Sequence, residues 1–284
     1  MKKNSLIKWL FVLPIIIYST LLIALPILYI FVISFLKSDS YGGMIHVINI
    51  QNYIELFDSV YLKIFLQSAV VAIITTLICI LISYPFVLAV SHKSKKTQQI
   101  LMTLVMVPFL TNSLIRMYGW IVLLRKSGVI NQLLLGLGFI DEPLSLMYNA
   151  FGIIIGMVYT LLPFMVLPLY SSVSTIDKSL LEASSDLGAS KWNRFKNVIF
   201  PQTIPGLFNG SLMVFTPALG YFFIVDILGG GKIMILGNLI KNQFLTARNW
   251  PFGAAISVFL ILITYLLISL YKKIGGKMDD LGGM

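Results

Sequence analysis

Six apolar stretches, each long enough to cross a lipid bilayer, constrain the fold of this chain more than any other feature. A transmembrane helix needs about 20 predominantly apolar residues. Only 11% of the 284 residues are charged, whereas a soluble domain has about 25%. We therefore predict an all-α integral membrane protein that forms a single transmembrane domain over residues 1–284. The six predicted transmembrane helices lie near residues 10–36, 64–91, 100–124, 149–171, 205–228 and 252–271.

The N-terminus also has features of a secretory signal peptide, because Lys2 and Lys3 precede an apolar run. That run continues to about Phe35 and contains Pro14 and Pro26, and it offers no clear cleavage site between small residues. We expect it to be retained as the first transmembrane helix.

The basic residues indicate the orientation of the helices, because cytoplasmic loops are enriched in Lys and Arg. Alternate loops hold thirteen and seven of these residues, which puts both termini and a hairpin over residues 172–204 in the cytoplasm. The net charge of +10 is thereby explained by topology, and no basic and aromatic motif for nucleic acid accompanies it. The larger group is Lys2, Lys3, Lys8, Lys93, Lys95, Lys96, Lys178, Lys191, Arg194, Lys196, Lys272, Lys273 and Lys277; the smaller is Lys37, Lys63, Arg125, Lys126, Lys232, Lys241 and Arg248.

The polar hairpin 172–204 is predicted to contain two short helices. Ser179 and Glu182 have capping-box spacing, which predicts that a helix begins there. Gly188 allows the chain to turn after that helix. Ser190 can cap a second helix, which we expect Pro201 and then Pro205 to end.

No catalytic residues are predicted. The run Gly229 to Lys232 is not a phosphate-binding loop, because Asp226 and Ile233 stand where that motif needs Gly and Ser or Thr. Cys79 is a lone cysteine, and the two histidines are isolated, so we predict no metal site and no cofactor on this chain. Any energy source then lies on another chain or in an ion gradient.

A substrate path is predicted around Asp226, beside Tyr221 near the outer end of the fifth apolar stretch. A charged side chain within the membrane costs about 2.5 to 3.5 kcal/mol on insertion scales, so it should face a partner or a water-filled path. An acid among aromatic rings suits an ammonium substrate. A structural ion pair with Arg116 explains the same residue equally well. Tyr118, Trp120 and Tyr159 are further candidates, although such rings are more often interfacial anchors.

The hairpin resembles the EAA loop of bacterial ABC-importer permeases. The similarity rests on Glu182-Ala183-Ser184, on Gly188 three residues later, and on Val198-Ile199-Phe200-Pro201 after nine more. The sequence departs from the family pattern at Ser184, Val198 and Phe200. In that family the first helix of the loop docks into the ATPase subunit, which implies a coupling role here for Glu182, Ala183, Leu187, Gly188 and Ala189.

Further blocks make the chain similar to the spermidine/putrescine branch of these permeases, at residues 107–116, 161–172, 237–240 and 249–255. The resemblance implies a type I importer permease (MetI-like) fold and ATP-driven polyamine uptake at the bacterial cytoplasmic membrane. It also implies a second permease, an ATPase dimer that holds ATP and Mg²⁺, and an extracytoplasmic substrate-binding protein.

Three other functions are considered. A permease for iron, sulfate or phosphonate would share the EAA loop. A gradient-driven carrier is expected to have inverted repeats and more ionisable groups within the membrane, and the sequence has no convincing internal repeat. A membrane scaffold without transport activity would leave the hairpin unexplained.

Overall fold

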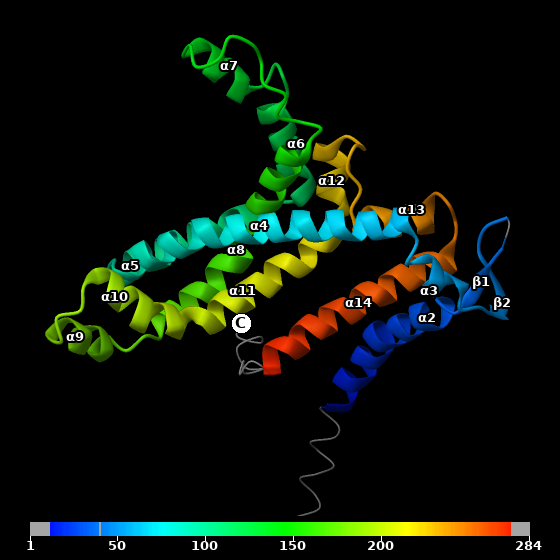
Figure 1. Cartoon of the computed structure of the whole chain (residues 1–284), viewed down its shortest axis with the longest axis horizontal. Helices are drawn as coiled ribbons and strands as arrows, with labels where there is room; N and C mark the ends of the chain where they lie inside the picture. Colours follow the sequence, from blue (N-terminus) through cyan, green and yellow to red (C-terminus); the bar gives the residue numbers. More distant parts are fainter. Residues whose placement is uncertain (1–11, 40, 274–284) are drawn as a thin grey trace, which may run out of the picture. The chain divides into compact units, whose positions relative to one another are not determined.

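A computed structural model describes residues 12–39 and 41–273 (Figure 1). The N-terminal lysines of the topology argument, Lys277, and the first residues of the first predicted span lie outside this part. The elements are η1 (Thr20–Ala24), α2 (Leu25–Ile33), β1 (Leu36–Ser38), β2 (Met44–Ile48), α3 (Gln51–Glu55), α4 (Ser59–Ser91), α5 (Lys95–Leu110), α6 (Ser113–Leu124), α7 (Val129–Gly136), α8 (Ala150–Ser174), α9 (Lys178–Asp186), α10 (Lys191–Arg194), η2 (Phe195–Ile199), α11 (Phe200–Gly220), α12 (Phe222–Gly229), α13 (Leu236–Leu245) and α14 (Trp250–Lys273).

Five helices among the described residues are long and apolar enough to cross a membrane. They are Val12–Ile33, Ser59–Ser91, Ala150–Ser174, Lys191–Gly220 and Trp250–Leu270. A sixth span is possible only as a broken one, because Lys95–Leu110 and Ser113–Gly136 meet at a bend of 93°.

The apolar stretch 100–124, predicted as one transmembrane helix, is thus divided between α5 and α6. Thr111 is extended, and the Asn112 side chain accepts a hydrogen bond of 2.8 Å from the backbone N–H of Leu114. Asn112 thus caps a new helix, α6, in the middle of the apolar run.

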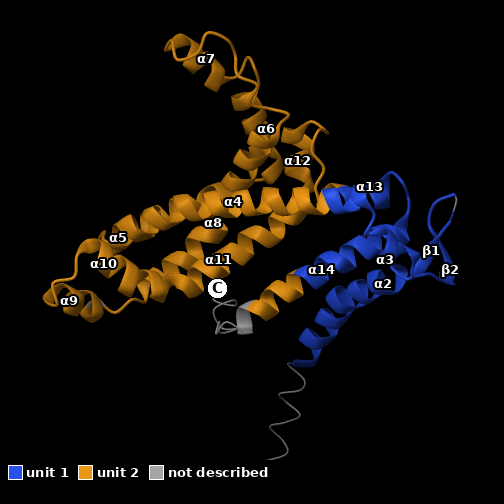
Figure 2. Cartoon of the chain, in the orientation of Figure 1, with its two compact units in different colours: residues 1–63, 239–263 blue, residues 64–238, 264–284 orange. Residues whose placement is uncertain are grey.

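The chain divides into two compact units, residues 1–63 with 239–263 and residues 64–238 with 264–284 (Figure 2). The first unit contains a short antiparallel hairpin in which Leu36 pairs with Ile48. The buried Asn52 side chain holds this hairpin, because its Nδ2 donates to the carbonyls of Ser34 and Leu36 at 2.9 and 2.8 Å. These strands correct the all-α prediction, since hydropathy does not detect short pairs outside the membrane spans.

The second unit is organised around α8, which packs along α11. Gly206 and Gly210 of α11 make this close approach possible. A Cβ added at Gly206 would lie 2.6 Å from the Pro168 carbonyl oxygen, and one at Gly210 would lie 3.2 Å from that of Met165. Small residues at such crossings are typical of membrane helices, whose association depends on close packing.

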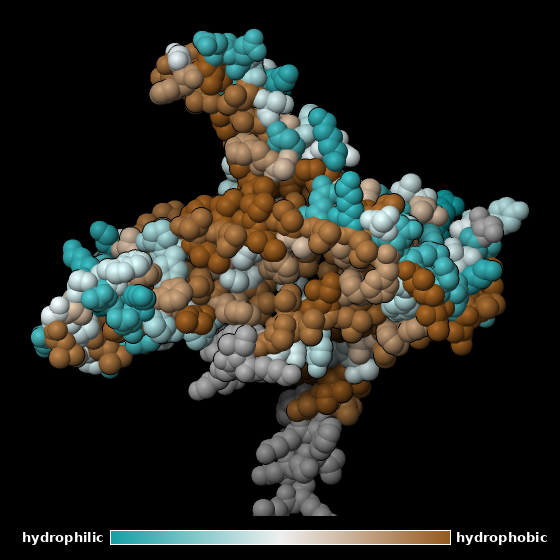
Figure 3. Space-filling model, in the orientation of Figure 1, coloured by the Kyte–Doolittle hydropathy of each residue, from teal (hydrophilic) through white to brown (hydrophobic). Residues whose placement is uncertain are grey.

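The outer surface of the second unit is apolar along its long helices. Leu66 and Leu81 of α4 are 68% and 72% exposed, and Figure 3 shows hydrophobic side chains over α4. Hydrophilic side chains gather instead over α9 and α10 (Figure 3). This separation is expected where lipid or an apolar partner covers the helices and water surrounds the hairpin.

Candidate functional site

The predicted hairpin is present, but its first helix begins differently. Asp177 caps α9, since its carboxylate accepts a hydrogen bond of 2.9 Å from the backbone N–H of Ser179. The capping box of Ser179 and Glu182 is therefore wrong, because both Asp177 and Ser179 suit a cap and the structure uses the earlier one. Hydrogen bonding from the backbone N–H of Ser179, and to a lesser extent from its side chain, holds the pKa of Asp177 below its ordinary value.

The turn between the two arms lies at Gly188, as predicted. Gly188 has a φ of +74°, a conformation that favours glycine. Its N–H donates to the Ser185 carbonyl at 2.9 Å, and Ala189 donates to Ser184 at 3.0 Å. Arg194 of α10 closes the turn through a hydrogen bond of 2.9 Å from Nη1 to the Ser185 hydroxyl.

The predicted coupling residues gather at this tip. Glu182, Ala183 and Gly188 are exposed, and Ala189 is half-buried. Leu187 is 88% exposed, although it is a large apolar residue.

Ser190 caps the second arm, as predicted, by accepting from the Asn193 N–H at 3.2 Å. The prediction that Pro201 and Pro205 end this arm is wrong. The arm continues through the π-helical turn η2 into α11, so that Lys191–Gly220 forms one membrane-length helix. Pro201 stands in the first turn of α11, directly after the widened π-turn.

Aromatic side chains join this second arm to α4. Phe195 stacks on Trp192 with ring centroids 5.6 Å apart and meets Tyr84 edge-on, also at 5.6 Å. Tyr84 is also hydrogen-bonded to Thr203 of α11. These contacts connect the second arm of the hairpin to α4 and α11.

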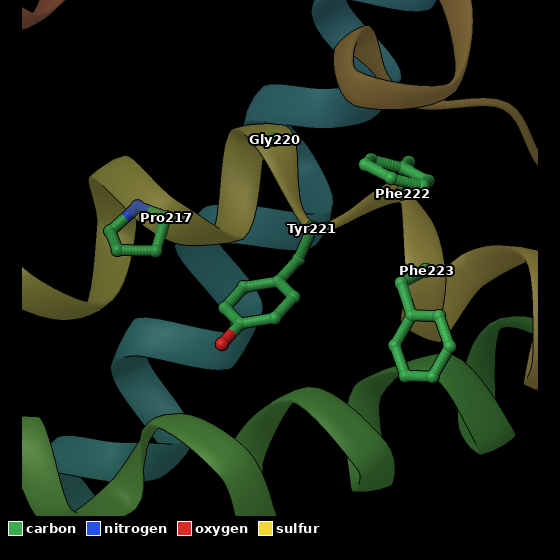
Figure 4. A pocket seen from close by; sticks show the side chains of 5 residues that line it. All are labelled: Pro217, Gly220, Tyr221, Phe222 and Phe223. Carbon is green, nitrogen blue, oxygen red and sulfur yellow. The ribbon is translucent and has the colours of Figure 1, made fainter. Parts of the chain in front are cut away.

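A second candidate site lies where α11 ends and α12 begins. Tyr221 interrupts the helix with φ −76° and ψ 57°. A hollow of about 400 Å³ at this break is lined by Pro217, Gly220, Tyr221, Phe222 and Phe223. Figure 4 shows the rings of Tyr221 and Phe223 on the same side of the link between the helices.

Asp226 is exposed on α12, one turn beyond these rings. Its Oδ1 accepts a hydrogen bond of 2.6 Å from Asn238 Nδ2. Asn238 was missed by the sequence interpretation, although the run Gly237-Asn238-Leu239-Ile240 carries part of the family resemblance. A polar amide within an apolar run was the available signal.

Arg116 and Trp120 of α6 form a separate cluster with Tyr159 of α8. The Arg116 guanidinium lies 5.9 Å from the centroid of the Tyr159 ring. Trp120 meets the same ring edge-on at 5.4 Å. Tyr118 is 62% exposed. Arg116 thus has a cation–π contact with Tyr159, and Asp226 has its hydrogen bond with Asn238.

Comparison with solved structures places the fold. A bacterial alginate ABC transporter in complex with an alginate pentasaccharide-bound periplasmic protein matches with a TM-score of 0.77 and 15% identity, over 94% of this chain and 93% of the other. A crystal structure of a bacterial ABC transporter involved in alginate import matches with a TM-score of 0.73 and 15% identity, over 96% and 97%. This chain therefore shares its fold with chains of bacterial ABC transporters.

Sequence comparison then gives the family. Residues 82–280 match the family described as "Binding-protein-dependent transport system inner membrane component". The spermidine/putrescine transport system permease protein PotB of Salmonella typhimurium (strain SL1344) is 43% identical over 285 residues, 99% of each chain. PotB of Escherichia coli (strain K12) is 44% identical over 256 residues, 90% of this chain and 93% of that protein. The chain therefore belongs to this family of inner membrane permease components.

Proposed function

We propose that this chain is one permease of an ATP-driven importer that carries polyamines into the bacterial cytoplasm. The sequence identity of 43%, over 99% of both chains, to a permease named for spermidine and putrescine is the observation that carries the proposal. The structure adds a carboxylate, Asp226, one helical turn from aromatic rings. This combination suits a flexible chain of ammonium groups through charge and cation–π attraction.

We further propose six transmembrane spans with both termini and the hairpin in the cytoplasm. The five long helices and the bent pair Lys95–Leu110 and Ser113–Gly136 supply the spans. The excess of Lys and Arg on the loops that include α9 and α10 supports the orientation.

The proposed complex contains a second, PotC-like permease, a PotA-like ATPase dimer and a PotD-like extracytoplasmic binding protein. ATP and Mg²⁺ would bind to the ATPase, and this chain would carry out no chemistry itself. The exposed tip around Leu187 would dock into the ATPase. Movement of that tip would pass along the continuous helix Lys191–Gly220 to the break at Tyr221, next to the candidate substrate path.

Uptake by the reconstituted complex tests this proposal. Proteoliposomes that hold both permeases and the ATPase should accumulate labelled spermidine only with ATP inside and binding protein outside. Uptake without the ATPase would favour a gradient-driven carrier instead. Transport of sulfate, iron or phosphonate in place of spermidine would favour the related importers.

The role of Asp226 is tested in the same vesicles. Asp226→Asn keeps the size of the side chain and removes its charge, so spermidine uptake per assembled complex should fall about tenfold or more, the effect of losing about 1.4 kcal/mol of interaction. If Asp226 has only a structural role, Asp226→Asn should lower the amount of assembled complex and leave uptake per complex unchanged. Unchanged uptake per complex in the single variant would remove Asp226 from the substrate path.

A further inference from the structure

Asn238, at the start of α13, is a buried amide whose hydrogen-bonding groups are all used at the α11–α12 break. Its side chain is 4% exposed. Nδ2 donates to the Phe222 carbonyl at 3.2 Å and to Asp226 Oδ1 at 2.6 Å. Oδ1 accepts from the Ile235 N–H at 3.2 Å. One side chain therefore connects the first turn of α12, the Asp226 carboxylate and the loop before α13.

The backbone around Asn238 is fixed independently of Asp226. The N–H of Leu236 donates at 2.9 Å to the hydroxyl of Ser68, a fully buried residue of α4. Gly237 allows the chain to touch the end of α11, because a Cβ added there would lie only 2.6 Å from the backbone carbon of Gly220. Asn238 is thus held from both sides while its amide points at Asp226.

We infer that Asn238 is a positioning residue for the substrate cation, which acts by fixing the direction of the Asp226 carboxylate. The inference rests on the proposed substrate role of Asp226. An Asp side chain on an exposed helix face has several rotamers. A short hydrogen bond to a charged acceptor selects one of them. Because the donor is a neutral amide, Asn238 orients the carboxylate without cancelling its charge.

The contacts of Asn238 lie directly after the break. Tyr221 leaves the helical conformation between α11 and α12, and Phe222 is the first residue of α12. Asn238 supplies a donor to the Phe222 carbonyl and, with its second hydrogen, to Asp226. The position of the carboxylate is thereby tied to the geometry of the break, which is the place where the hollow lined by Tyr221 and Phe223 lies.

The number of spermidine molecules imported per ATP hydrolysed distinguishes positioning from a structural role. In the complete complex with saturating loaded binding protein, Asn238→Ala should lower this ratio about tenfold, while ATP hydrolysis per assembled complex stays within about twofold. A residue that matters only for folding would reduce the amount of complex and leave the ratio unchanged, which would overturn the inference.

Asn131 provides a matched control in the same unit. It is also a fully buried amide, which donates to the Leu144 carbonyl and accepts from the Leu144 N–H, both at 2.9 Å. Asn131→Ala should lower the yield of complex without changing the ratio of spermidine to ATP. A fall in the ratio as large as that for Asn238→Ala would contradict a specific role of Asn238.

If the Asn238→Ala variant does not assemble, exchanging the side chains of Asp226 and Asn238 tests the same inference. Asn238→Asp alone places two carboxylates together and should reduce assembly. Adding Asp226→Asn restores a donor and an acceptor, so assembly should recover while the ratio stays low, because the charge has moved to a buried position. Recovery of the ratio would overturn the inference. If Asp226→Asn alone lowers the ratio and Asn238→Ala does not, the positioning role fails and the proposed substrate role of Asp226 stands.

Discussion

Tyr148 and Gly230 meet in the second unit with both backbones in the left-handed region. Their φ values are 61° and 59°. A Cβ added to Gly230 would lie 2.8 Å from Cγ and 2.9 Å from Cβ of Tyr148. The N–H of Tyr148 donates to the carbonyl of Leu228 at 2.8 Å. This contact fixes the end of α12 opposite to the break, so that the helix that carries Asp226 is held at both ends.

Gly230→Ala should therefore destabilise the protein through two effects, an unfavourable backbone conformation and a clash with the Tyr148 ring. The backbone effect alone costs about 1–2 kcal/mol for an L-residue. The thermal unfolding temperature of the purified complex measures the sum of both effects. Gly231→Ala is the matched control, because Gly231 has a φ of +74° and an added Cβ meets nothing within 4 Å. Equal shifts for the two variants would show that the Tyr148 contact contributes nothing.

The sequence predicted the apolar helices and the turn at Gly188 because both depend on local composition. Hydropathy within a window of about 20 residues detects membrane-length helices but not a cap inside one. Asn112 therefore went unrecognised, and the bend of 93° with it. Pro201 was expected to end a helix for a similar reason. Amino-acid composition does not reveal the π-helical turn that precedes this proline.

The Asn238 contact with Asp226 could not be predicted, because it depends on tertiary structure. The two residues lie twelve positions apart, on different helices, and meet only because the chain reverses between α12 and α13. The ion pair between Asp226 and Arg116 was suggested only because the two side chains have opposite charges. In the structure Arg116 lies over Tyr159, which the sequence had suggested only as a separate candidate.

The cap of the coupling helix gives a pH-dependent prediction. Hydrogen bonds from the backbone N–H and then the side chain of Ser179 hold the pKa of Asp177 below its ordinary value of 3.8. The pKa of Asp177 is lower in the folded protein than in the unfolded chain. The ionised carboxylate therefore stabilises the folded protein above about pH 3.8, and this stabilisation is lost as the pH falls through the folded-state pKa. Amide hydrogen exchange in α9 should therefore be faster in the Asp177→Ala variant than in the native protein near neutral pH. In the native protein it should become faster only under acidic conditions, where Asp177 is protonated.

Ser179→Ala is the control for this cap. It should change the exchange of α9 less than Asp177→Ala does, because the Asp177 carboxylate still accepts from the backbone N–H of residue 179. The opposite order would restore the capping box of Ser179 and Glu182.

Topology is tested with single cysteines in a Cys79→Ala background. Cysteine at the exposed positions Ser94 and Ser185 should react only after the membrane is opened, because both lie on loops assigned to the cytoplasm. Cysteine at Ser127, exposed on a loop of the opposite group, should react with an impermeant reagent in intact cells. Gly276, a further cytoplasmic position, lies outside the described residues. Labelling at Ser185 in intact cells would reverse the proposed orientation.

The hairpin turn provides the sharpest test of coupling. Gly188 has a φ of +74°, and an added Cβ meets nothing within 4 Å in the described chain. Within the described chain, only the left-handed conformation therefore requires glycine at this position. Gly188→Val should disturb the turn and lower spermidine import per ATP hydrolysed, because a β-branched residue strongly disfavours positive φ. Gly188→Asn should retain most of the import, because Asn tolerates this conformation. Both ratios are measured in the reconstituted complex.

Two outcomes would contradict this prediction. If the Val variant assembles with its ATPase and imports normally, the hairpin is not the coupling element. If the Asn variant is as defective as the Val variant, the backbone conformation of residue 188 is not the cause of the defect.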